Sequence, residues 1–286
     1  MVPFANRRHD SIIAGARDGG FAGLAKRGAR AFKHGSHRTT KEPQMSLPPI
    51  VVFDLDGTLA ETAPDIMRTL NVILEREGLP ALPLERAREL VGAGARALIS
   101  RGFKVSGRPL DDETLERLFE EFLLIYAEDV ASNSFLFDGV LDALDTLAAE
   151  GYALAVCTNK PILHTRLILD HFKIAQRFAA VAGRDSFPFH KPDPRHLTLT
   201  IEAAGADPAR AVMIGDSRTD ITTARAAGIP TICVPFGYTD VPIETLEPDL
   251  IIQHFDALPE AVRQILGGGG GQEAGNTSDG KVPAHS

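Results

Sequence analysis

Two carboxylates dominate the candidate chemistry of this chain. Asp54 and Asp56 stand two residues apart, directly after the apolar run 50–53, and Gly57 follows them. Alternate residues of an extended chain point the same way, so both side chains reach one place, and the glycine permits a tight turn. Open parallel sheets bind ligands at this end of their strands, although Asp-x-Asp-Gly also occurs in plain turns and calcium loops. A calcium loop of the EF-hand type is excluded, because apolar residues interrupt its alternating oxygen ligands.

A second acidic cluster follows another apolar run, 211–214. It contains Asp216 and Asp220, and on its own it is explained by capping of the helix that comes next. Together with Asp54 and Asp56 it gains weight, because carboxylates that converge at one sheet edge repel one another unless a cation offsets their charge. Mg²⁺ prefers one or two carboxylates, waters and substrate phosphate, so the sequence predicts Mg²⁺ as the cofactor.

Three further residues suit the binding of a phosphate. Thr158 and Asn159 follow the apolar run 154–157, where a hydroxyl and the backbone N–H groups of a helix start can hold phosphate oxygens. Lys191 precedes a helix and can place a cation opposite the carboxylates. Each alone is weak, since Thr and Asn are common caps and a lysine is usually a solvated surface residue.

The elements that must position these residues alternate between strands and helices. Helix signals lie between the strands: Asp193 caps a helix whose first residue is Pro194, and Gly228 ends the helix that starts near Arg218. Nearly continuous apolar strands alternating with helices predict an α/β fold with a Rossmann-like parallel sheet, which binds ligands at the carboxyl ends of its strands. The predicted strands are 50–53, 154–157, 211–214 and 231–234.

One insertion interrupts the alternation. Residues 62–133 carry helical patterns only, so we predict a small helical cap there, between the core segments 48–61 and 134–266. Phe119, Phe122 and Phe135 are expected in the hydrophobic core. The glycine-rich end, 267–286, is expected to be a flexible tail.

Residues 1–47 form a basic extension that we expect to be disordered. The first 45 residues hold nine Lys or Arg and three acids, which leaves 21 basic and 35 acidic residues, a net charge of −14, in the remainder. A targeting segment, a start codon at Met45 and a nucleic-acid-binding arm are the alternatives; a secretory signal is excluded, because no apolar core follows the basic start. The acidic balance of the whole chain, −8, argues against general affinity for nucleic acid or anionic membranes.

Cysteine usage and hydropathy indicate the compartment. The only two cysteines, Cys157 and Cys233, fall in predicted strands and are read as core residues, so a disulfide framework is excluded. No apolar run approaches the ~18 residues of a membrane helix. A cytoplasmic protein is expected, and the nine histidines show no zinc-ligand spacing.

Taken in chain order, four pieces of the sequence resemble the motifs of the haloacid dehalogenase superfamily of phosphatases. They are Asp54-Leu55-Asp56-Gly57-Thr58, Thr158, Lys191 and Gly215-Asp216-Ser217-Arg218-Thr219-Asp220. The resemblance covers residues 49–266, and the helical insertion is similar to that superfamily's mobile cap. Within it the chain is most similar to phosphoglycolate phosphatases, through four stretches. These are Thr62-Ala63-Pro64-Asp65, Val91-Gly92-Ala93-Gly94, Phe236-Gly237-Tyr238 and Glu247-Pro248-Asp249.

The resemblance implies a mechanism. Asp54 would attack phosphorus to form an aspartyl-phosphate, and Asp56 would protonate the leaving alkoxide and then activate water. Mg²⁺ would be held by the Asp54 and Asp216 side chains and the backbone carbonyl of Asp56. Thr158, Asn159 and Lys191 would bind the phosphoryl oxygens, and Asp220 would orient Lys191 or a metal-bound water.

The cap would enclose a small phosphorylated metabolite, 2-phosphoglycolate in the first instance. Gly92, Gly94 and Arg96 are the candidates for holding its carboxylate; a solvated Arg96 and a plain turn at the two glycines are the alternatives. Sugar phosphates, nucleoside monophosphates and pyrophosphate remain alternative substrates, and a non-catalytic binding or regulatory protein is the rival class. A phosphomutase is disfavoured by Thr58 and a dehalogenase by Asp56. No nucleic-acid or membrane partner is expected, and both a monomer and a dimer stay open.

Overall fold

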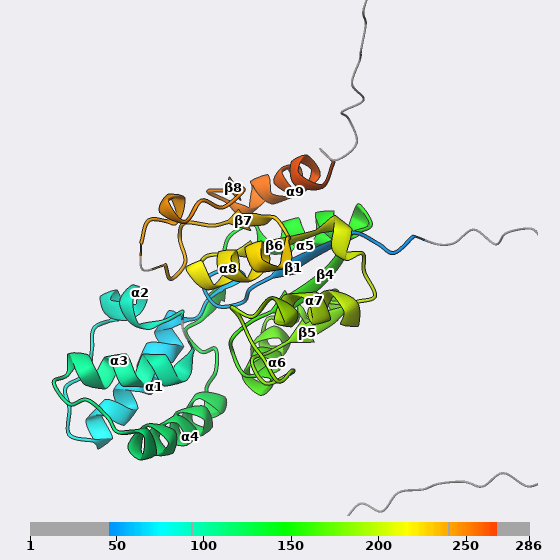
Figure 1. The fold of residues 1–286 in the computed structure, drawn as a ribbon. Coiled ribbons are helices and arrows are strands. Elements are labelled where there is room, and N and C mark those ends of the chain that lie inside the picture. Colours follow the sequence, from blue (N-terminus) through cyan, green and yellow to red (C-terminus); the bar gives the residue numbers. More distant parts are fainter. Residues whose placement is uncertain (1–45, 93, 240, 268–286) are drawn as a thin grey trace, which may run out of the picture. The chain divides into compact units, whose positions relative to one another are not determined.

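A six-stranded parallel sheet forms the centre of the molecule (Figure 1). The computed structural model describes residues 46–267 except 93 and 240. The strand order is β5-β4-β1-β6-β7-β8, and every neighbouring pair is parallel. The bounds are β1 Ile50–Phe53, β4 Ala153–Cys157, β5 Ala180–Ala182, β6 Ala211–Gly215, β7 Thr231–Cys233 and β8 Leu250–Ile251.

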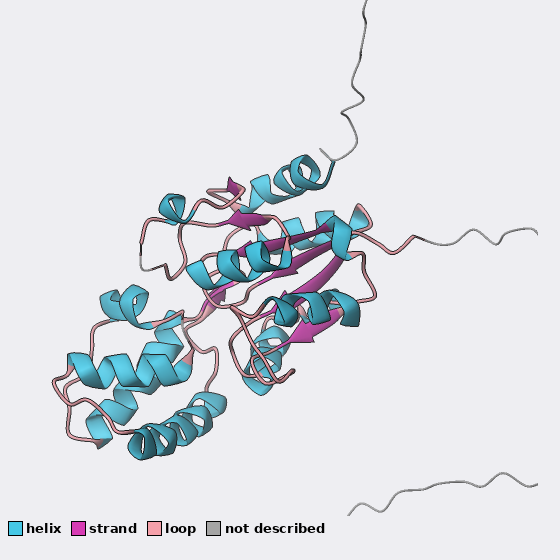
Figure 2. Ribbon diagram, viewed as in Figure 1, coloured by secondary structure: helices cyan, strands magenta, loops and turns pink. Residues whose placement is uncertain are grey.

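The central strands are buried on both faces, which explains their continuous apolar sequences. Val51 and Phe53 of β1 pack into one hydrophobic cluster with helices α5, α6 and α9, whereas Ile50 and Val52 pack into another with α7 and α8. Helices therefore cover both faces of the sheet (Figure 2). The helix bounds are α5 Val140–Ala149, α6 Ile162–His171, α7 Pro194–Ala203, α8 Arg218–Ala227 and α9 Leu258–Gly267.

A helical insertion with its own core follows β1. Its helices are α1 Ala63–Arg76, α2 Ala87–Leu90, α3 Ala95–Val105 and α4 Asp112–Glu128, and their apolar faces form a separate cluster around buried side chains such as Leu70 and Phe103. The chain enters this insertion through β2 Ala60–Glu61 and leaves it through β3 Phe135–Leu136. These two strands pair antiparallel, so the beginning and the end of the insertion lie side by side.

The predicted α/β fold with a Rossmann-like parallel sheet and a helical insertion is confirmed. All four predicted strands are present, and the helices capped by Asp193 and ended by Gly228 begin and end as expected. Strands β5 and β8 were not predicted, because each has only two or three residues. Phe135 was wrongly assigned to the core: it is 54% exposed in the short strand β3, while Phe119 and Phe122 are buried.

Two predicted regions lie largely outside the described residues. The basic extension 1–47 is described only at residues 46 and 47, and the tail 267–286 only at Gly267, which ends α9. Within the described ranges, no helix has both the length and the hydropathy of a membrane span.

Candidate active site

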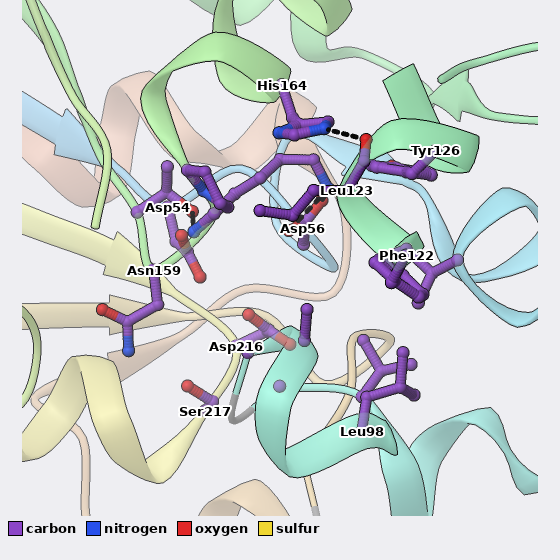
Figure 3. Close-up of a pocket in the computed structure, with 18 residues that line it drawn as sticks. Asp54, Asp56, Leu98, Phe122, Leu123, Tyr126, Asn159, His164, Asp216 and Ser217 are labelled. Carbon is purple, nitrogen blue, oxygen red and sulfur yellow. Dashed lines mark hydrogen bonds and ion pairs between the residues drawn. The ribbon is translucent and has the colours of Figure 1, made fainter. Parts of the chain in front are cut away.

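Three neighbouring strand ends bring the predicted site residues together. Asp54 follows β1, Thr158 follows β4 and Asp216 follows β6, and these strands are adjacent in the order β4-β1-β6. Because parallel strands end at the same edge, their carboxyl-terminal residues converge. Asp54, Asp56, Asn159 and Asp216 accordingly border one cavity (Figure 3).

Asp54 is a buried carboxylate beside a buried lysine. Its side chain lies at the bottom of the cavity, and Lys191 Nζ is 3.0 Å from Asp54 Oδ1. That contact is an ion pair without hydrogen-bond geometry, so Oδ1 is buried with no hydrogen-bond donor among the described residues. Burial raises the pKa of Asp54 to about 6, against the lowering effect of the Lys191 charge.

Asp220 holds Lys191 in place. Lys191 Nζ donates to Asp220 Oδ1 at 2.6 Å, and both side chains are almost fully buried. The other oxygen, Oδ2, accepts from the backbone N–H of Ser217 at 3.1 Å and from its hydroxyl at 2.6 Å, which fixes the first turn of α8. Burial by itself would lower the pKa of Lys191, but the charges of Asp220 and Asp54 outweigh it and raise the pKa, so the lysine stays cationic.

Asp216 is fixed by donors on both of its oxygens. Oδ1 accepts from the Thr58 hydroxyl at 3.0 Å, and Oδ2 accepts from the Tyr238 backbone N–H at 2.6 Å. Gly57, with φ +80°, lies so close that an added Cβ would be 2.5 Å from Asp216 Oδ2. Burial, and then the charges of Asp220 and Asp54, raise the pKa of Asp216 well above its ordinary value.

The site could hold a metal ion through its acidic cluster. Asp54, Asp216 and Asp220 each offer an oxygen, and these three atoms lie within 4.8 Å of one another. The fit is supported by the unpartnered buried Oδ1 of Asp54 and by the raised pKa values, since a cation removes the cost of burying several like charges. Oxygen donors without nitrogen or sulfur suit a hard divalent cation. In the described structure the third carboxylate of the cluster is therefore Asp220, where the sequence suggested a supporting role.

Asp56 turns away from this cluster. Its Oδ1 accepts from the Thr62 hydroxyl at 2.6 Å, and Lys160 Nζ lies 2.9 Å from Oδ1 and 3.1 Å from Oδ2. Burial by itself would lower the pKa of Lys160, but the charge of Asp56 outweighs this effect and the pKa is raised. The Asp56 side chain thus stands apart from the three carboxylates that could hold a metal, on the side of the cavity where Lys160 and Tyr126 lie.

Thr158 and Asn159 border the same cavity beside Asp54. The Thr158 hydroxyl is buried and accepts from the Lys160 backbone N–H at 3.2 Å, which leaves its own hydrogen available to a ligand. Asn159 donates to the Lys191 carbonyl at 3.0 Å, while its buried Oδ1 has no partner among the described residues. Two of the three residues predicted to bind phosphate thus border this cavity, and the third, Lys191, lies beside Asp54.

The helical insertion forms the opposite wall. The cavity encloses about 650 Å³ of empty space, its mouth included, and both Gly92 and Gly94 line it. Apolar side chains of the insertion complete the wall; they are Ile66, Val91, Leu98, Phe122 and Leu123. Closure of such a wall over a ligand excludes water from the reacting groups.

Arg96 does not line this cavity. Its guanidinium donates to both carboxylate oxygens of Glu116, at 2.6 and 2.8 Å, and stacks on the Phe119 ring. It borders a neighbouring hollow together with Arg184. In this structure Arg96 therefore lies beside the cavity and not in its lining.

Sequence reasoning missed four residues of this site. Lys160 reaches the cavity from the core and Tyr126 from the cap, and His164 of α6 lies 2.9 Å from the Leu123 carbonyl of cap helix α4. Tyr238 accepts from the N–H groups of Thr62 and Ala63 at the start of α1. Lys160 could have been found, since it directly follows Thr158-Asn159; nothing in the sequence singles out the other three for these contacts.

Comparison with known proteins decides the family. A model of the family described as haloacid dehalogenase-like hydrolase matches residues 51–234, more than half of the chain. The chain belongs to this family. The resemblance stated from the four motifs is thus confirmed, and the chain is an enzyme of the family's hydrolase type.

Several similar members of the family carry the name phosphoglycolate phosphatase. A phosphoglycolate phosphatase of Mesorhizobium japonicum is 46% identical over 218 residues, which cover 76% of this chain and 96% of the relative. One of Caulobacter vibrioides is also 46% identical, over 216 residues that cover 76% and 91%. Among solved structures, a predicted phosphoglycolate phosphatase from Haemophilus somnus matches with TM-score 0.70 and 31% identity, over 76% of this chain and 99% of that one. The likeness to this group extends over nearly the whole length of its members.

Proposed function

We propose that the chain hydrolyses phosphomonoesters with the help of Mg²⁺, and that 2-phosphoglycolate is its substrate. The observation that carries the reaction class is the buried pair of Asp54 and Lys191 beside Asp216, with Asp56 set apart on the cap side. The substrate is supported by the relatives named phosphoglycolate phosphatase, which are up to 46% identical. A cavity walled by apolar cap side chains suits a small ligand whose polar groups face the core.

In the first step the Asp54 carboxylate attacks phosphorus. A bond forms between its oxygen and phosphorus, and the bond from phosphorus to the leaving oxygen breaks. Asp56 gives its proton to that oxygen, so the alcohol leaves neutral. Thr158 and the cationic Lys191 hold the phosphoryl oxygens while their charge redistributes.

In the second step water releases the phosphate. Asp56, now deprotonated, takes a proton from a water that attacks the phosphorus of the aspartyl-phosphate, and the bond from phosphorus to Asp54 breaks. Asp54 is regenerated and Asp56 is protonated for the next cycle. When bound by Asp54, Asp216 and the backbone carbonyl of Asp56 or the side chain of Asp220, Mg²⁺ would supply charge that offsets the repulsion between carboxylates and phosphate.

The division of labour follows the separation between the hydrophobic clusters of the sheet and that of the insertion. We propose that the core, 48–61 with 134–266, carries the chemistry, and that the cap, 62–133, encloses the substrate, with Gly92 and Gly94 leaving room for it. Support comes from the separate apolar core of the insertion and from its position over the cavity. The cytoplasmic location and the monomeric or dimeric state stay predictions.

The test is phosphate release from a panel of esters. The panel contains 2-phosphoglycolate, sugar phosphates, nucleoside monophosphates and pyrophosphate, each with Mg²⁺ and with EDTA, and wild type is run beside Asp54→Asn. We expect 2-phosphoglycolate to have the highest kcat/KM, and both EDTA and Asp54→Asn to lower kcat at least about 10³-fold. Another leading ester with the same two dependences would overturn the substrate, and no hydrolysis at all would favour a binding protein.

A further inference from the structure

The site contains two buried lysines with separate partners, and of the two only Lys160 lines the cavity. Lys191 lies between Asp54 and Asp220, at 3.0 and 2.6 Å. Lys160 lies against Asp56, and its side chain is only 4% exposed. Lys191 is therefore paired with Asp54, the proposed nucleophile, and Lys160 is paired with Asp56, the proposed proton donor.

This pairing puts Lys160 on the side of the leaving group. Asp56 must reach the leaving oxygen to protonate it, and Lys160 Nζ is within 3.1 Å of both oxygens of Asp56. A group attached to the leaving oxygen by one carbon therefore comes within reach of the lysine. The carboxylate of 2-phosphoglycolate is such a group.

The rest of the cavity leaves this position without another cation. Of the 18 described lining residues, Lys160 has the single side chain that is permanently positive. Arg96 is paired with Glu116 outside this lining, and burial lowers the pKa of His164, which favours its neutral form. An anion enclosed by apolar walls needs an opposite charge, because burying it unpaired costs several kcal/mol.

Tyr126 adds a second donor at the same place. Its ring centroid lies 4.6 Å from Lys160 Nζ, and its buried hydroxyl has no hydrogen-bond partner among the described residues. The phenol comes from cap helix α4 and the lysine from the core. A carboxylate placed between cap and core could thus accept from both.

We propose that Lys160 is the specificity-determining residue that binds the leaving-group carboxylate, assisted by the Tyr126 hydroxyl. The inference rests on the proposed function and assigns its substrate preference to a core residue. The enzyme then binds two negative charges of the ester: the phosphoryl group beside Lys191 and the carboxylate beside Lys160. A phosphomonoester with a neutral leaving group of equal size satisfies only the first.

The test compares two esters in matched variants. The substrates are 2-phosphoglycolate and 2-hydroxyethyl phosphate, which has a neutral hydroxymethyl group in place of the carboxylate. Lys160→Met should lower kcat/KM for 2-phosphoglycolate about 10- to 100-fold more than for the neutral ester, the loss expected for a charged hydrogen bond. Lys160→Arg should restore part of the preference, and Lys104→Gln, an exposed lysine of α3, should leave it unchanged.

The ratio of the two substrates separates a specificity role from a structural one. If Lys160 only orients Asp56 or supports the fold, both esters lose activity by the same factor, and the proposal is overturned. Failure of the proposed function is visible separately, in wild type alone, as a lack of preference for 2-phosphoglycolate over the panel.

A second measurement keeps the test open if Lys160→Met does not fold. Glycolate, which keeps the carboxylate, should inhibit the wild-type enzyme at least tenfold more strongly than ethylene glycol, which lacks it. Lys160→Arg should reduce that difference. Equal inhibition of wild type by the two alcohols would refute binding of the carboxylate.

Discussion

Asp220 serves two structures with its two oxygens. Oδ1 accepts from the buried Lys191, and Oδ2 holds the N-terminal turn of α8 through Ser217. In Asp220→Asn the amide oxygen can still accept from Lys191 or from Ser217, but the NH₂ group then faces the other of these two donors. We expect the free energy of unfolding to fall by about 3 kcal/mol, as for a broken buried pair, and kcat to fall by about 10²-fold.

Chemical denaturation and steady-state kinetics measure the two effects of Asp220→Asn. Asp170→Asn, an exposed aspartate of α6, is the matched control and should change stability by no more than about 0.5 kcal/mol. Unchanged kcat in Asp220→Asn would mean that Lys191 is positioned by Asp54 alone.

His196 makes stability depend on pH. It is fully buried, its Nε2 lies 3.1 Å from the Gly183 carbonyl, and its Nδ1 accepts from the Lys191 backbone N–H at 3.3 Å. Burial lowers its pKa from 6.5 to about 4, so the folded state favours the neutral ring. As the pH falls, the unfolded chain therefore binds a proton at this histidine before the folded protein does. The contribution of the neutral ring to the free energy of unfolding is fully present above pH 6.5 and is lost as the pH falls toward 4.

The measurement is denaturant unfolding between pH 4 and 8 in wild type and His196→Gln. The variant should be less stable at pH 8 but should lose less stability on acidification. Parallel pH curves would show that another group titrates in this range.

At the scale of elements, a helix pair holds the cap against the core. His164 of α6 bonds the carbonyl of Leu123 in α4 at 2.9 Å, and its ring stacks on Tyr126 at 5.4 Å between centroids (Figure 3). His164→Ala removes both contacts. We expect KM for 2-phosphoglycolate to rise about three- to tenfold, because a less populated closed state lowers the apparent affinity.

Hydrogen exchange gives an independent measure of the same change. Amides of α4 should exchange faster in His164→Ala, while those of β1 and β6 should not change. His171→Ala, an exposed histidine of the same helix α6, is the control. A KM equal to that of wild type would show that other contacts keep the cap closed.

The sequence is most informative where local pattern and tertiary structure coincide. Asp54, Thr158 and Asp216 could be predicted because each follows an apolar strand, and parallel strands must end together. Lys160 and Tyr126 could not be paired from sequence, since their contact depends on how the cap packs on the core. The partner of Arg96 could not be predicted for a similar reason: only the folded cap brings Glu116 to its guanidinium.

At the scale of the whole molecule, an acidic protein must attract an anionic substrate. Residues 46–286 carry a net charge of −14, yet Arg184 lines a neighbouring hollow that shares Gly94 and Asn159 with the cavity of the candidate site. Burial, and then the charge of Arg96, lower the pKa of Arg184, and no acidic partner contacts it in the described ranges. Arg184→Gln should lower kcat/KM two- to fivefold at low salt with kcat unchanged.

Salt dependence distinguishes attraction at a distance from direct contact. The deficit of Arg184→Gln should shrink as ionic strength rises, because salt screens the attraction between this partly buried charge and a distant substrate. Arg166→Gln, on the surface of α6, is the control. A deficit that is the same at all salt concentrations would mean that Arg184 touches the bound substrate.

The short ribbon of β2 and β3 has a consequence for how this family diversifies. Because the two ends of the inserted segment pair with each other, the chain leaves and re-enters the core at the same place whatever lies between them. A different insertion can then replace the present one without moving Asp54 or Asp216. The hydrolytic machinery and the cap that encloses the substrate are thus heritable as separate parts, and a different enclosing wall can arise by exchange of a single continuous piece of gene.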